Sequence, residues 1–436
     1  MYEAYAAASG NPPALPPYLL PPNQVPAIPG ADPASAVAGS AYRALVALYP
    51  RQRSMFDARL GALGLPLTAA SRNGLKFGRA VADRLLQLRS SDPIFNDTPH
   101  PPPAPKPAHR PDPQDPRQPN HGRAYGSAKP FASANNLVLN PPPYGAGLAP
   151  AYLTALTEVR SKGIKPEYSG TVPVATLRTT DETMVGVFWG YDGAMNLGTP
   201  PRLYNQILRE LAASFVPALN VGQQARMFAL ANAAMGDAGI LAWREKYKHN
   251  FWRPVVGIRE HDASLGWPPG TSPGAVGALS DTNWLPFGAP KSNVLADNFT
   301  PPFPAYPSGH ATFGAAAFGV VRHYLERLST GQIGAFRANG PDNFFTGGFV
   351  SDECNGQTTD GRGVVRPRHV RAFPGGLWQM IIENGRSRVF LGVHWVFDAF
   401  AVDNAGNPDL TNNIGGVKLG LDIAHSVMAN GLQQQP

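Results

Sequence analysis

The chain has 436 residues, of which 43% are hydrophobic and only 15% are charged, and its formal net charge is +7. Its 46 glycines and 47 prolines predict long irregular connections around a substantial core, and its single cysteine, Cys354, excludes an internal disulfide. No basic stripe with interleaved aromatic residues is visible, and no run reaches the roughly 18 apolar residues of a membrane helix, so we expect neither nucleic-acid binding nor a membrane span.

The N-terminal segment combines an arm, short helices and a proline-rich loop. Residues 1–34 are rich in Ala, Pro and Gly, and we expect them to form an extended arm. Apolar residues at helical spacing predict helices over 42–49, 50–63 and 78–88. Residues 97–120 are dense in proline, which predicts polyproline-like or irregular backbone.

The rest of the chain shows the 3.6-residue period of longer helices and little two-residue alternation. Loops rich in Gly, Pro, Ser and Asp are expected over 257–300 and 329–370. The fold class is therefore predicted to be all-α, with helical bundles joined by long Pro/Gly-rich loops. The helices are expected over 149–162, 203–216, 222–248, 310–328, 377–386, 394–401 and 417–428.

We expect one compact unit with two parts. Residues 1–130 would pack as an N-terminal arm, helices and Pro-rich loop on a catalytic helical-bundle region over 131–436. The start of the chain, Met1-Tyr-Glu-Ala-Tyr, lacks a basic region followed by an apolar core, so no signal peptide is visible. We therefore expect a soluble protein, and the sequence leaves its location and any export route open.

The stretch 301–316 contains Pro-Ser-Gly-His at the point where a proline-rich run gives way to a helix-forming apolar run. Ser308 is a good helix N-cap, and Gly309 lets the backbone approach a ligand closely. The free amides at such a helix start can hold an oxyanion, with the Ser308 hydroxyl and the His310 ring directed at it. Ser-Gly-His is also a common helix cap, so this stretch alone is equally consistent with a structural role.

Two further clusters supply charge and imidazole. Lys246 and Arg253 lie seven residues apart, which is two helical turns, so both are expected on one helix face. Downstream, Arg388 precedes His394 and Asp398, which are four residues apart and could share a helix face. Each cluster taken separately could be structural. Together with the Pro-Ser-Gly-His stretch they supply three permanent cations, a hydroxyl, exposed amides and two imidazoles, which is the set that a tetrahedral or trigonal-bipyramidal oxyanion requires.

In chain order the three segments read Lys-x6-Arg-Pro, Pro-Ser-Gly-His and Ser-Arg-x5-His-x3-Asp. This pattern resembles the three-part signature of the type 2 phosphatidic acid phosphatases and vanadium haloperoxidases. The resemblance to the chloroperoxidases of the vanadium family extends from about residue 97 to about residue 432 and is strong after 185. The segments that carry it include Trp189-Gly-Tyr-Asp-Gly, Gly198-Thr-Pro-Pro-Arg, Phe251-Trp-Arg-Pro and Ile414-Gly-Gly.

The resemblance implies a vanadate cofactor and a role for each matching residue. His394 would form the single bond between the protein and vanadium. His310 would face the opposite apical oxygen and act as the acid–base catalyst. The residues that would bind the oxygens, and whose three cations would also make bound peroxide electrophilic, are Lys246, Arg253, Arg388, Ser308 and Gly309.

Supporting roles are implied for residues around this set. Asp192 would steady Arg388, and Trp243 and Phe303 would line a halide pocket. Asp398 either holds the far nitrogen of the metal-binding histidine or caps a local turn. Lys248 and His249 follow Lys246 directly, and their spacing predicts that they turn away from it to the surface.

The resemblance implies a vanadate-dependent haloperoxidase that oxidises chloride or bromide with hydrogen peroxide to hypohalous acid, which halogenates a small organic substrate. The alternative is a soluble acid phosphatase with a phosphohistidine intermediate at His394, because phosphate and vanadate fit the same cradle. The long insertions and the Trp243–Phe303 pair favour the peroxidase. A protein that binds an anion without catalysis would leave the acid–base pair unexplained. The sequence does not indicate the halide preference, the organic substrate or the oligomeric state.

Overall fold

The computed structural model is mostly α-helical, with three antiparallel pairs of two-residue strands in the part of the chain that it describes. The predicted all-α class is therefore confirmed. None of the described helices is long and apolar enough to cross a membrane. The described residues are 1–9, 24–93, 96–100, 106–145, 149–261, 280–330, 340–345 and 347–430.

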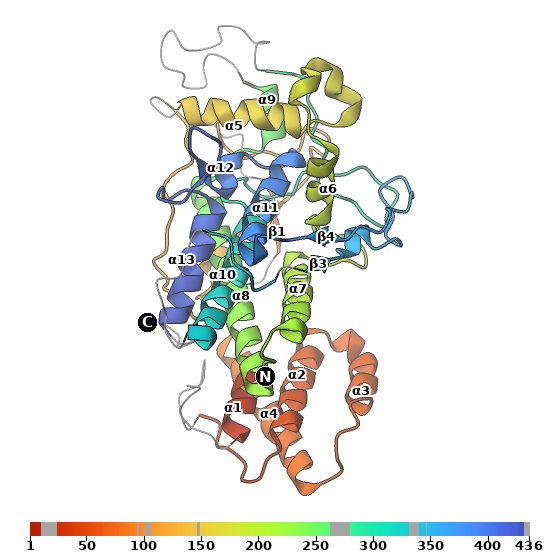
Figure 1. The fold of residues 1–436 in the computed structure, drawn as a ribbon, viewed down its shortest axis with the longest axis vertical. Coiled ribbons are helices and arrows are strands. Elements are labelled where there is room, and N and C mark those ends of the chain that lie inside the picture. Colours follow the sequence, from red (N-terminus) through yellow and green to blue (C-terminus); the bar gives the residue numbers. More distant parts are fainter. Residues whose placement is uncertain are drawn as a thin grey trace.

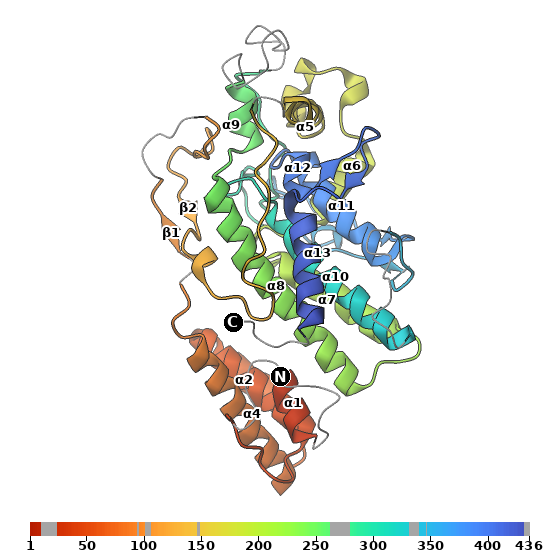
Figure 2. The ribbon, with the colours of Figure 1, turned by 90° about the vertical axis from the view of Figure 1, so that its left-hand side faces the viewer.

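Four helices from the N-terminal part of the chain gather at one end of the molecule (Figures 1 and 2). They are α1 (Tyr2–Ala8), α2 (Pro33–Leu48), α3 (Arg53–Gly61) and α4 (Ala69–Leu88). Helices α2 and α4 lie against each other so closely that a Cβ added at Gly78 would stand 2.0 Å from the backbone of α2. The N-terminal helices are thus a tightly packed group at the lower end of Figure 1.

The expectation of an extended arm over 1–34 is wrong for its first residues, which form α1. The Ala-rich sequence of this segment favours a helix, because alanine has the highest helix propensity. Tyr2 and Ala4 are buried, and the Tyr2 hydroxyl accepts a hydrogen bond from Arg226 of the central bundle at 2.8 Å. Part of the expected arm, residues 10–23, lies outside the described residues.

Helix α2 starts nine residues before the predicted boundary at 42, at Pro33. The Asp32 carboxylate accepts a hydrogen bond from the Ser35 amide at 2.7 Å, and Pro33 occupies the first helical position. Both are recognised helix-start signals. The periodicity of apolar residues indicated the helix but not its beginning.

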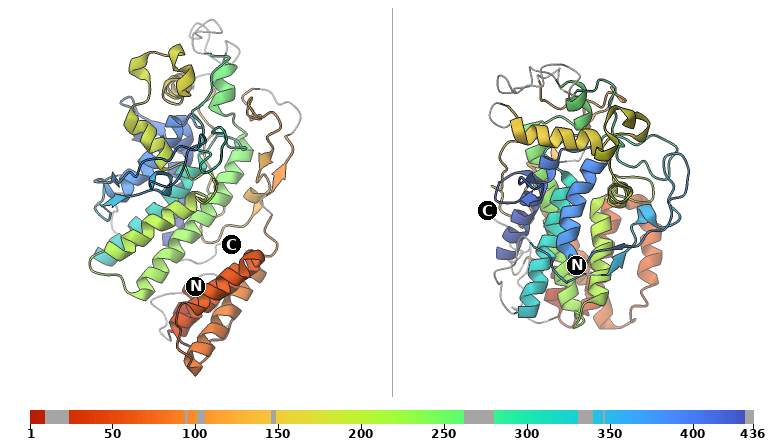
Figure 3. Two further views of the ribbon diagram at one scale, coloured as in Figure 1. Left: turned by 90° about the vertical axis from the view of Figure 1, so that its right-hand side faces the viewer. Right: turned by 45° about the horizontal axis from the view of Figure 1, so that its top comes forward.

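Five helices form the central bundle, and Figure 3 shows them running side by side away from the N-terminal group. They are α7 (Pro200–Ser214), α8 (Val221–His249), α10 (Gly309–Thr330), α11 (Gly376–Phe390) and α13 (Gly415–Ala429). Helix α10 packs against each of the other four and is apolar around most of its circumference. A helix that is buried on all sides belongs to the core, so the other helices surround α10.

Small residues bring α13 against the start of α10. A Cβ added at Gly416 would lie 2.4 Å from the Ser308 carbonyl oxygen, and one at Gly420 would lie 2.5 Å from that of Thr312. No side chain fits at either position. The last helix of the chain therefore packs directly on the backbone that precedes and opens α10.

Shorter helices cover the far end of the bundle, at the top of Figure 1. They are α5 (Ala149–Lys162), α6 (Thr180–Phe188), α9 (Pro254–Arg259) and α12 (Val396–Ala399). Helix α6 was not expected from the sequence, although it begins with a capping box between Thr179 and Glu182. The 3₁₀ turns and strand pairs are η1 (Pro50–Gln52), η2 (Tyr125–Ser127), η3 (Pro166–Thr171), η4 (Val174–Thr176), η5 (Asp352–Cys354), β1 (Asp97–Thr98) with β2 (Asn120–His121), β3 (Gly348–Phe349) with β4 (Arg371–Ala372), and β5 (Ala401–Val402) with β6 (Pro408–Asp409).

Candidate active site

The N-terminal end of α10 is held in place by the segment that carries the third motif. The Ser308 amide donates to the carbonyl oxygen of Asp398 at 2.7 Å, and the Ser308 hydroxyl oxygen faces the Ala311 amide at 3.4 Å. Ser308 is fully buried and His310 is 7% exposed. Ser308 therefore occupies the predicted cap position, and the amides of the first helical turn lie beside it.

Lys246 is fully buried near the end of α8. Its ammonium group donates to the carbonyl oxygens of Pro304 at 2.8 Å and Ala305 at 3.0 Å, and also to that of Pro307. These three bonds use all three N–H donors of the group. Lys246 thus fixes the turn that leads into α10 while placing a positive charge behind it.

The expectation that Lys246 and Arg253 share one helix face is wrong. Helix α8 ends at His249, and Asn250 adopts a left-handed conformation with φ 47°. Arg253 then occupies the N-cap position of the next helix, α9. The turn between the two helices still brings both cations into one cluster.

Arg253 and His394 meet directly in that cluster. Arg253 donates through Nη1 to His394 Nε2 at 3.0 Å and to the Val393 carbonyl at 2.7 Å, and through Nε to the Phe303 carbonyl at 2.9 Å. His394 Nδ1 lies 2.8 Å from Asp398 Oδ2, to which it donates. The proton on Nδ1 leaves the Nε2 lone pair directed at the cations.

Asp398 fulfils both alternatives that the sequence left open. Its Oδ2 accepts from the His394 ring and, at 3.0 Å, from the Trp395 amide that begins α12. The predicted helix over 394–401 is wrong in its extent, because α12 spans only Val396–Ala399. His394 therefore precedes the helix, and the Asp398 carboxylate reaches back to it across the helix start.

Arg388 and His310 both face Asp192. Arg388 is fully buried at the end of α11 and donates through Nη2 to Asp192 Oδ1 at 2.8 Å. The Nε2 atom of His310 lies 3.8 Å from the same oxygen. One carboxylate thus orients the arginine of the third motif and stands near the histidine of the second.

An aromatic wall closes one side of the cluster. The rings of Trp243 and Phe303 have centroids 4.9 Å apart, and the cations of Lys246 and Arg253 stand 5.1 Å and 5.0 Å from the centre of the Phe303 ring. A Cβ at Gly309 would be 3.4 Å from the Trp243 ring. The two aromatic residues predicted to form a halide pocket therefore lie together beside the cations.

Burial disfavours charge throughout the cluster, and neighbouring cations add to this for the basic groups. The pKa of Lys246 lies well below its usual range because of burial and the charge of Arg253, and burial lowers the pKa of Arg253 to about 9. Burial and the surrounding cations also hold the pKa values of His310 and His394 well below normal. Both imidazoles are therefore neutral at neutral pH. Burial raises the pKa of Asp398 to about 7, and the two basic side chains oppose that rise.

Several buried donors of the cluster have no hydrogen-bond partner among the described residues. They are Arg253 Nη2 and Arg388 Nε and Nη1, and the Nε2 atom of the neutral His310 ring is also unpaired. Buried polar groups are normally paired, so a set of unpaired N–H donors on neighbouring cations requires an acceptor. An oxyanion with several oxygens satisfies these donors, and the donor set fits vanadate or phosphate.

Sequence reasoning missed two residues that hold His310. Asn384 Nδ2 and the Tyr204 hydroxyl donate to the His310 carbonyl oxygen at 2.7 Å and 3.1 Å, and they bond to each other at 3.0 Å. A Cβ at Gly314 would lie 2.4 Å from the Asn384 amide nitrogen. Gly314, within the stretch 301–316, was the available signal, since it makes room for this amide.

His249 is not the surface residue that its spacing suggested. Its side chain is 8% exposed, lies 3.1 Å from Glu245 Oε2, and meets the Tyr306 ring edge-to-face at 5.2 Å. Lys248 does lie at the surface, and it pairs with the same Glu245 at 3.0 Å. The prediction of a surface position therefore holds for Lys248 and is wrong for His249, which packs inside the fold.

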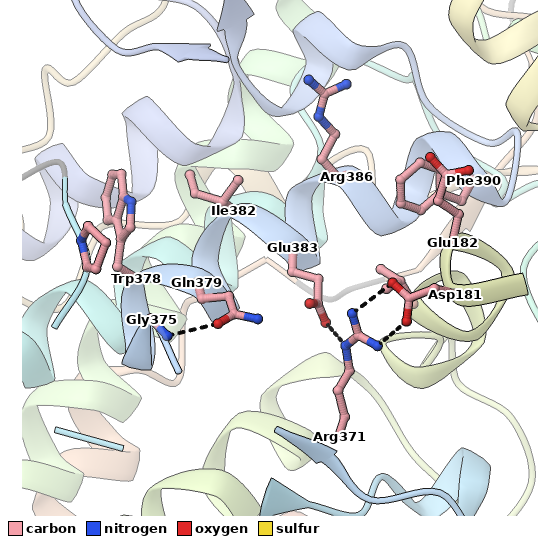
Figure 4. Close-up of a pocket in the computed structure, with 12 residues that line it drawn as sticks. Asp181, Glu182, Arg371, Gly375, Trp378, Gln379, Ile382, Glu383, Arg386 and Phe390 are labelled. Atoms are coloured by element: carbon pink, nitrogen blue, oxygen red, sulfur yellow. Dashed lines mark hydrogen bonds and ion pairs between the residues drawn. The ribbon is translucent and has the colours of Figure 1, made fainter. Parts of the chain in front are cut away.

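A separate pocket of about 510 Å³ opens on the other side of α11 (Figure 4). Its rim carries Arg371, which is paired with Asp181 and Glu383. None of the predicted site residues lines this pocket. The cation cluster and the pocket therefore use opposite faces of the same helix.

Comparison with known proteins places this cluster in context. Residues 226–408 match the family model of the VCPO second helical-bundle domain. The chain is 37% identical over 316 residues to the vanadium chloroperoxidase of Curvularia inaequalis, a match that covers 60% of this chain and 49% of that protein. The chain thus spans about half the length of this curated relative.

Two solved structures share the fold over nearly the whole chain. A bacterial vanadium-dependent iodoperoxidase aligns with a TM-score of 0.62 and 21% identity, covering 98% of this chain and 88% of its own. The holo form of a bacterial vanadium-dependent chloroperoxidase aligns with a TM-score of 0.59 and 14% identity, covering 99% and 91%. At these identities the alignments establish the common fold.

Proposed function

We propose that this chain belongs to the vanadium haloperoxidase family and is a vanadate-dependent haloperoxidase acting on chloride or bromide. Its substrates would be hydrogen peroxide and the halide, and the hypohalous acid formed would halogenate a small organic compound. The observation that carries the proposal is the group of unpaired donors on Arg253 and Arg388 around the Nε2 atom of His394. This set joins a metal ligand to an oxyanion cradle.

His394 is proposed as the one metal ligand. Its ring is neutral, and the bond from Nδ1–H to Asp398 fixes the tautomer that keeps the Nε2 lone pair available. Arg253 Nη1 donates to His394 Nε2 at 3.0 Å. If that lone pair bonds the metal instead, the N–H group of Arg253 would be free to donate to an oxygen of the oxyanion. Asp398 thereby acts through the histidine.

The cradle proposed for the vanadate oxygens combines charge and directed hydrogen bonds. Arg253 and Arg388 offer unpaired N–H groups, and the Ser308 hydroxyl and Gly309 amide lie at the start of α10. At an effective dielectric constant near 20, one pair of unit charges at 4 Å is worth roughly 4 kcal/mol. The two guanidiniums and the helix start can therefore hold a multivalent oxyanion with only one coordinating side chain.

Lys246 is proposed to contribute mainly by its charge. Its three hydrogen bonds to the carbonyls before α10 support the turn that presents Ser308 and Gly309. A cation in this position raises the local positive potential without directing a bond at the ligand. To bind an oxygen directly, it would have to give up one of these carbonyls.

His310 is proposed as the acid–base group. Its neutral ring presents an Nε2 atom that has no hydrogen-bond partner in the described structure and lies 3.8 Å from the Asp192 carboxylate. Asp192 can stabilise the imidazolium that forms when His310 takes up a proton. Vanadate bound in the cradle would supply the chemistry that activates hydrogen peroxide towards halide. Trp243 and Phe303 would line the halide pocket beside the cations.

The phosphatase alternative uses the same cradle but is not favoured, because the chain matches the haloperoxidase second bundle. The decisive experiment incubates the purified protein with vanadate, hydrogen peroxide and chloride or bromide, and follows halogenation of a diketone. A parallel arm measures phosphomonoester hydrolysis by vanadate-free protein. Vanadate-dependent halogenation without hydrolysis is the expected result, and hydrolysis without halogenation would overturn the proposal.

A further inference from the structure

The long insertion after α10 returns to the site through the turn that contains η5 (Asp352–Cys354). The Ser351 hydroxyl donates to the Phe188 carbonyl at 2.7 Å, and the Asp352 amide donates to the Tyr191 hydroxyl oxygen at 2.8 Å. These two hydrogen bonds hold the turn against the segment that follows α6. The next residue in one segment is Glu353, and the next in the other is Asp192.

Glu353 is fully buried and is held by one of its two oxygens. Oε2 accepts from Arg366 Nη1 at 2.6 Å and from the Ser292 hydroxyl at 2.5 Å. Oε1 is buried and has no hydrogen-bond partner in the part of the chain that the structure describes. A buried carboxyl group therefore has one satisfied oxygen and one that is free to respond to its surroundings.

The negative charge of Asp192 acts on the buried carboxyl group of Glu353. Burial raises the pKa of Glu353 to about 7, the Arg366 charge and the Ser292 hydrogen bond oppose the rise, and the charge of Asp192 adds to it. The Oδ2 atom of Asp192 is likewise buried without a partner among the described residues. Other titratable neighbours are Asp352, which pairs with Arg202 at 2.8 Å, the Tyr191 hydroxyl, which accepts from the Asp352 amide, and the Cys354 thiol, whose pKa burial raises to about 12.

We propose that Glu353 is a positioning residue for Asp192, and that its charge state tunes how strongly the Asp192–Arg388 pair and His310 hold an oxyanion. This inference rests on the proposed function. An ionised Glu353 places a second negative charge behind Asp192, which opposes binding of an anion in the cradle. A protonated Glu353 removes that charge and provides an O–H donor among the buried carboxylate oxygens.

The competing interpretation is that Glu353 only anchors Arg366 and Ser292, and so holds the insertion in place. A structural anchor would change stability and would weaken binding by the same factor at every pH. A charge that acts on Asp192 must instead produce a pH-dependent step. The pH profile of anion affinity therefore separates the two roles.

A matched control is available in Glu383. This glutamate also accepts from an arginine, Arg371, at 2.7 Å, and its Oε1 accepts from the Trp189 indole at 2.9 Å, in the same segment that leads to Asp192. It faces the separate pocket on the other side of α11 (Figure 4). Glu383→Gln therefore removes a similar charge near the same segment but away from the cradle.

The experiment measures dissociation constants for vanadate and inorganic phosphate by equilibrium dialysis from about pH 6 to about pH 8, a window that brackets the Glu353 pKa. Wild type, Glu353→Gln and Glu383→Gln are compared, so that titration of the anions themselves is common to all three. We expect the affinity of wild type and of Glu383→Gln to fall about three- to tenfold more across this window than that of Glu353→Gln.

An identical pH step in wild type and Glu353→Gln would overturn the inference, as would a uniform loss at all pH values. If Glu353→Gln does not fold, Glu353→Asp decides: a step displaced in pH supports the inference, and a step at unchanged pH contradicts it. Anion binding with the expected step but without halogenation would refute the proposed function alone. Failure of wild type to bind either anion would refute both.

Discussion

Buried arginines lie near both ends of helix α10, but only the one near its C-terminal end has a full set of protein partners within the described part of the chain. Near its C-terminal end, Arg322 is 1% exposed and donates to Asp342 Oδ2 and to the Gly340 carbonyl, both at 2.6 Å. Asp342 in turn accepts from the Leu377 and Trp378 amides at 3.0 Å. The cation and its counter-charge are thus both supplied and fully held by the protein.

At the N-terminal end, the cations outnumber their carboxylate partners. Arg388 has one hydrogen bond to Asp192 and two unpaired nitrogens, and Arg253 is bonded to carbonyls and an imidazole with one nitrogen unpaired, among the described residues. An uncompensated buried charge costs several kcal/mol, on the order of 3–5 kcal/mol when one partner of a pair is missing. One end of the helix is therefore built for stability and the other for a ligand.

Removal of the proposed metal ligand should have the largest effect at the ligand end. In His394→Ala the cations still attract vanadate, but no atom bonds the metal, so we expect vanadium to be lost completely on dialysis while the fold is retained. Vanadium content measured after exhaustive dialysis tests this. The control is His425→Ala, which removes an exposed histidine on α13. Retention at the wild-type ratio would show that His394 is not the ligand.

Breaking the ion pair should have the largest effect on folding. Asp342→Asn removes the carboxylate that pairs with buried Arg322, which should lower the free energy of unfolding by about 3–5 kcal/mol. Urea unfolding measures the loss, and vanadate affinity under native conditions should be unchanged. If vanadate affinity falls in parallel with stability, the two ends of α10 are not the independent regions described above.

His310 should separate turnover from binding within the ligand end. The cradle keeps its cations in His310→Ala, so vanadate affinity should fall by only about 1–2 kcal/mol, the value of one hydrogen bond. Catalysis should fall by about 10²–10⁴-fold, the usual contribution of a positioned acid–base group. Chloride is harder to oxidise than bromide, so chloride oxidation should suffer more. Steady-state halogenation by metal-saturated protein measures both activities. An equal small loss for both halides would show that His310 is a helix-cap residue and not the acid–base catalyst.

The smallest effect is expected from phosphate, which should compete with vanadate at the N-terminal end of α10. Phosphate fits the same unpaired donors, so it should slow reconstitution with vanadate and stabilise the metal-free protein by about 2.7 kcal/mol at one hundred times its dissociation constant. Reconstitution rates and thermal unfolding with and without millimolar phosphate provide the measurement. An unchanged rate would argue against a shared site.

Local sequence signals were sufficient for most of the bundle and for the members of the cluster. Helices α8, α11 and α13 follow the apolar period, because each buries one face, and α10 was visible as a long apolar run. The cations and imidazoles were found because the three motifs carry them in a fixed order. Their contacts, rather than their identity, are what the structure adds.

The parts that were wrong depend on tertiary packing. Lys246 and Arg253 converge through a left-handed residue, Asn250, and the link is pinned where the Trp252 amide donates to the Pro107 carbonyl at 2.9 Å. No local sequence pattern predicts a hydrogen bond between residues 252 and 107, which are far apart in the chain. Glu353 was missed for the same reason. The insertion that carries it shows no helical period, and only the folded chain brings Glu353 near Asp192.

The packing of Gly416 on the Ser308 carbonyl has a consequence for biosynthesis. Lys246, Ser308 and Arg388 all precede α13 in the chain, so they are synthesised before the helix that closes over the first turn of α10. The nascent chain therefore holds most of the binding groups before the surface that fixes their geometry exists. We expect the site to bind an oxyanion only after α13 has docked on the start of α10.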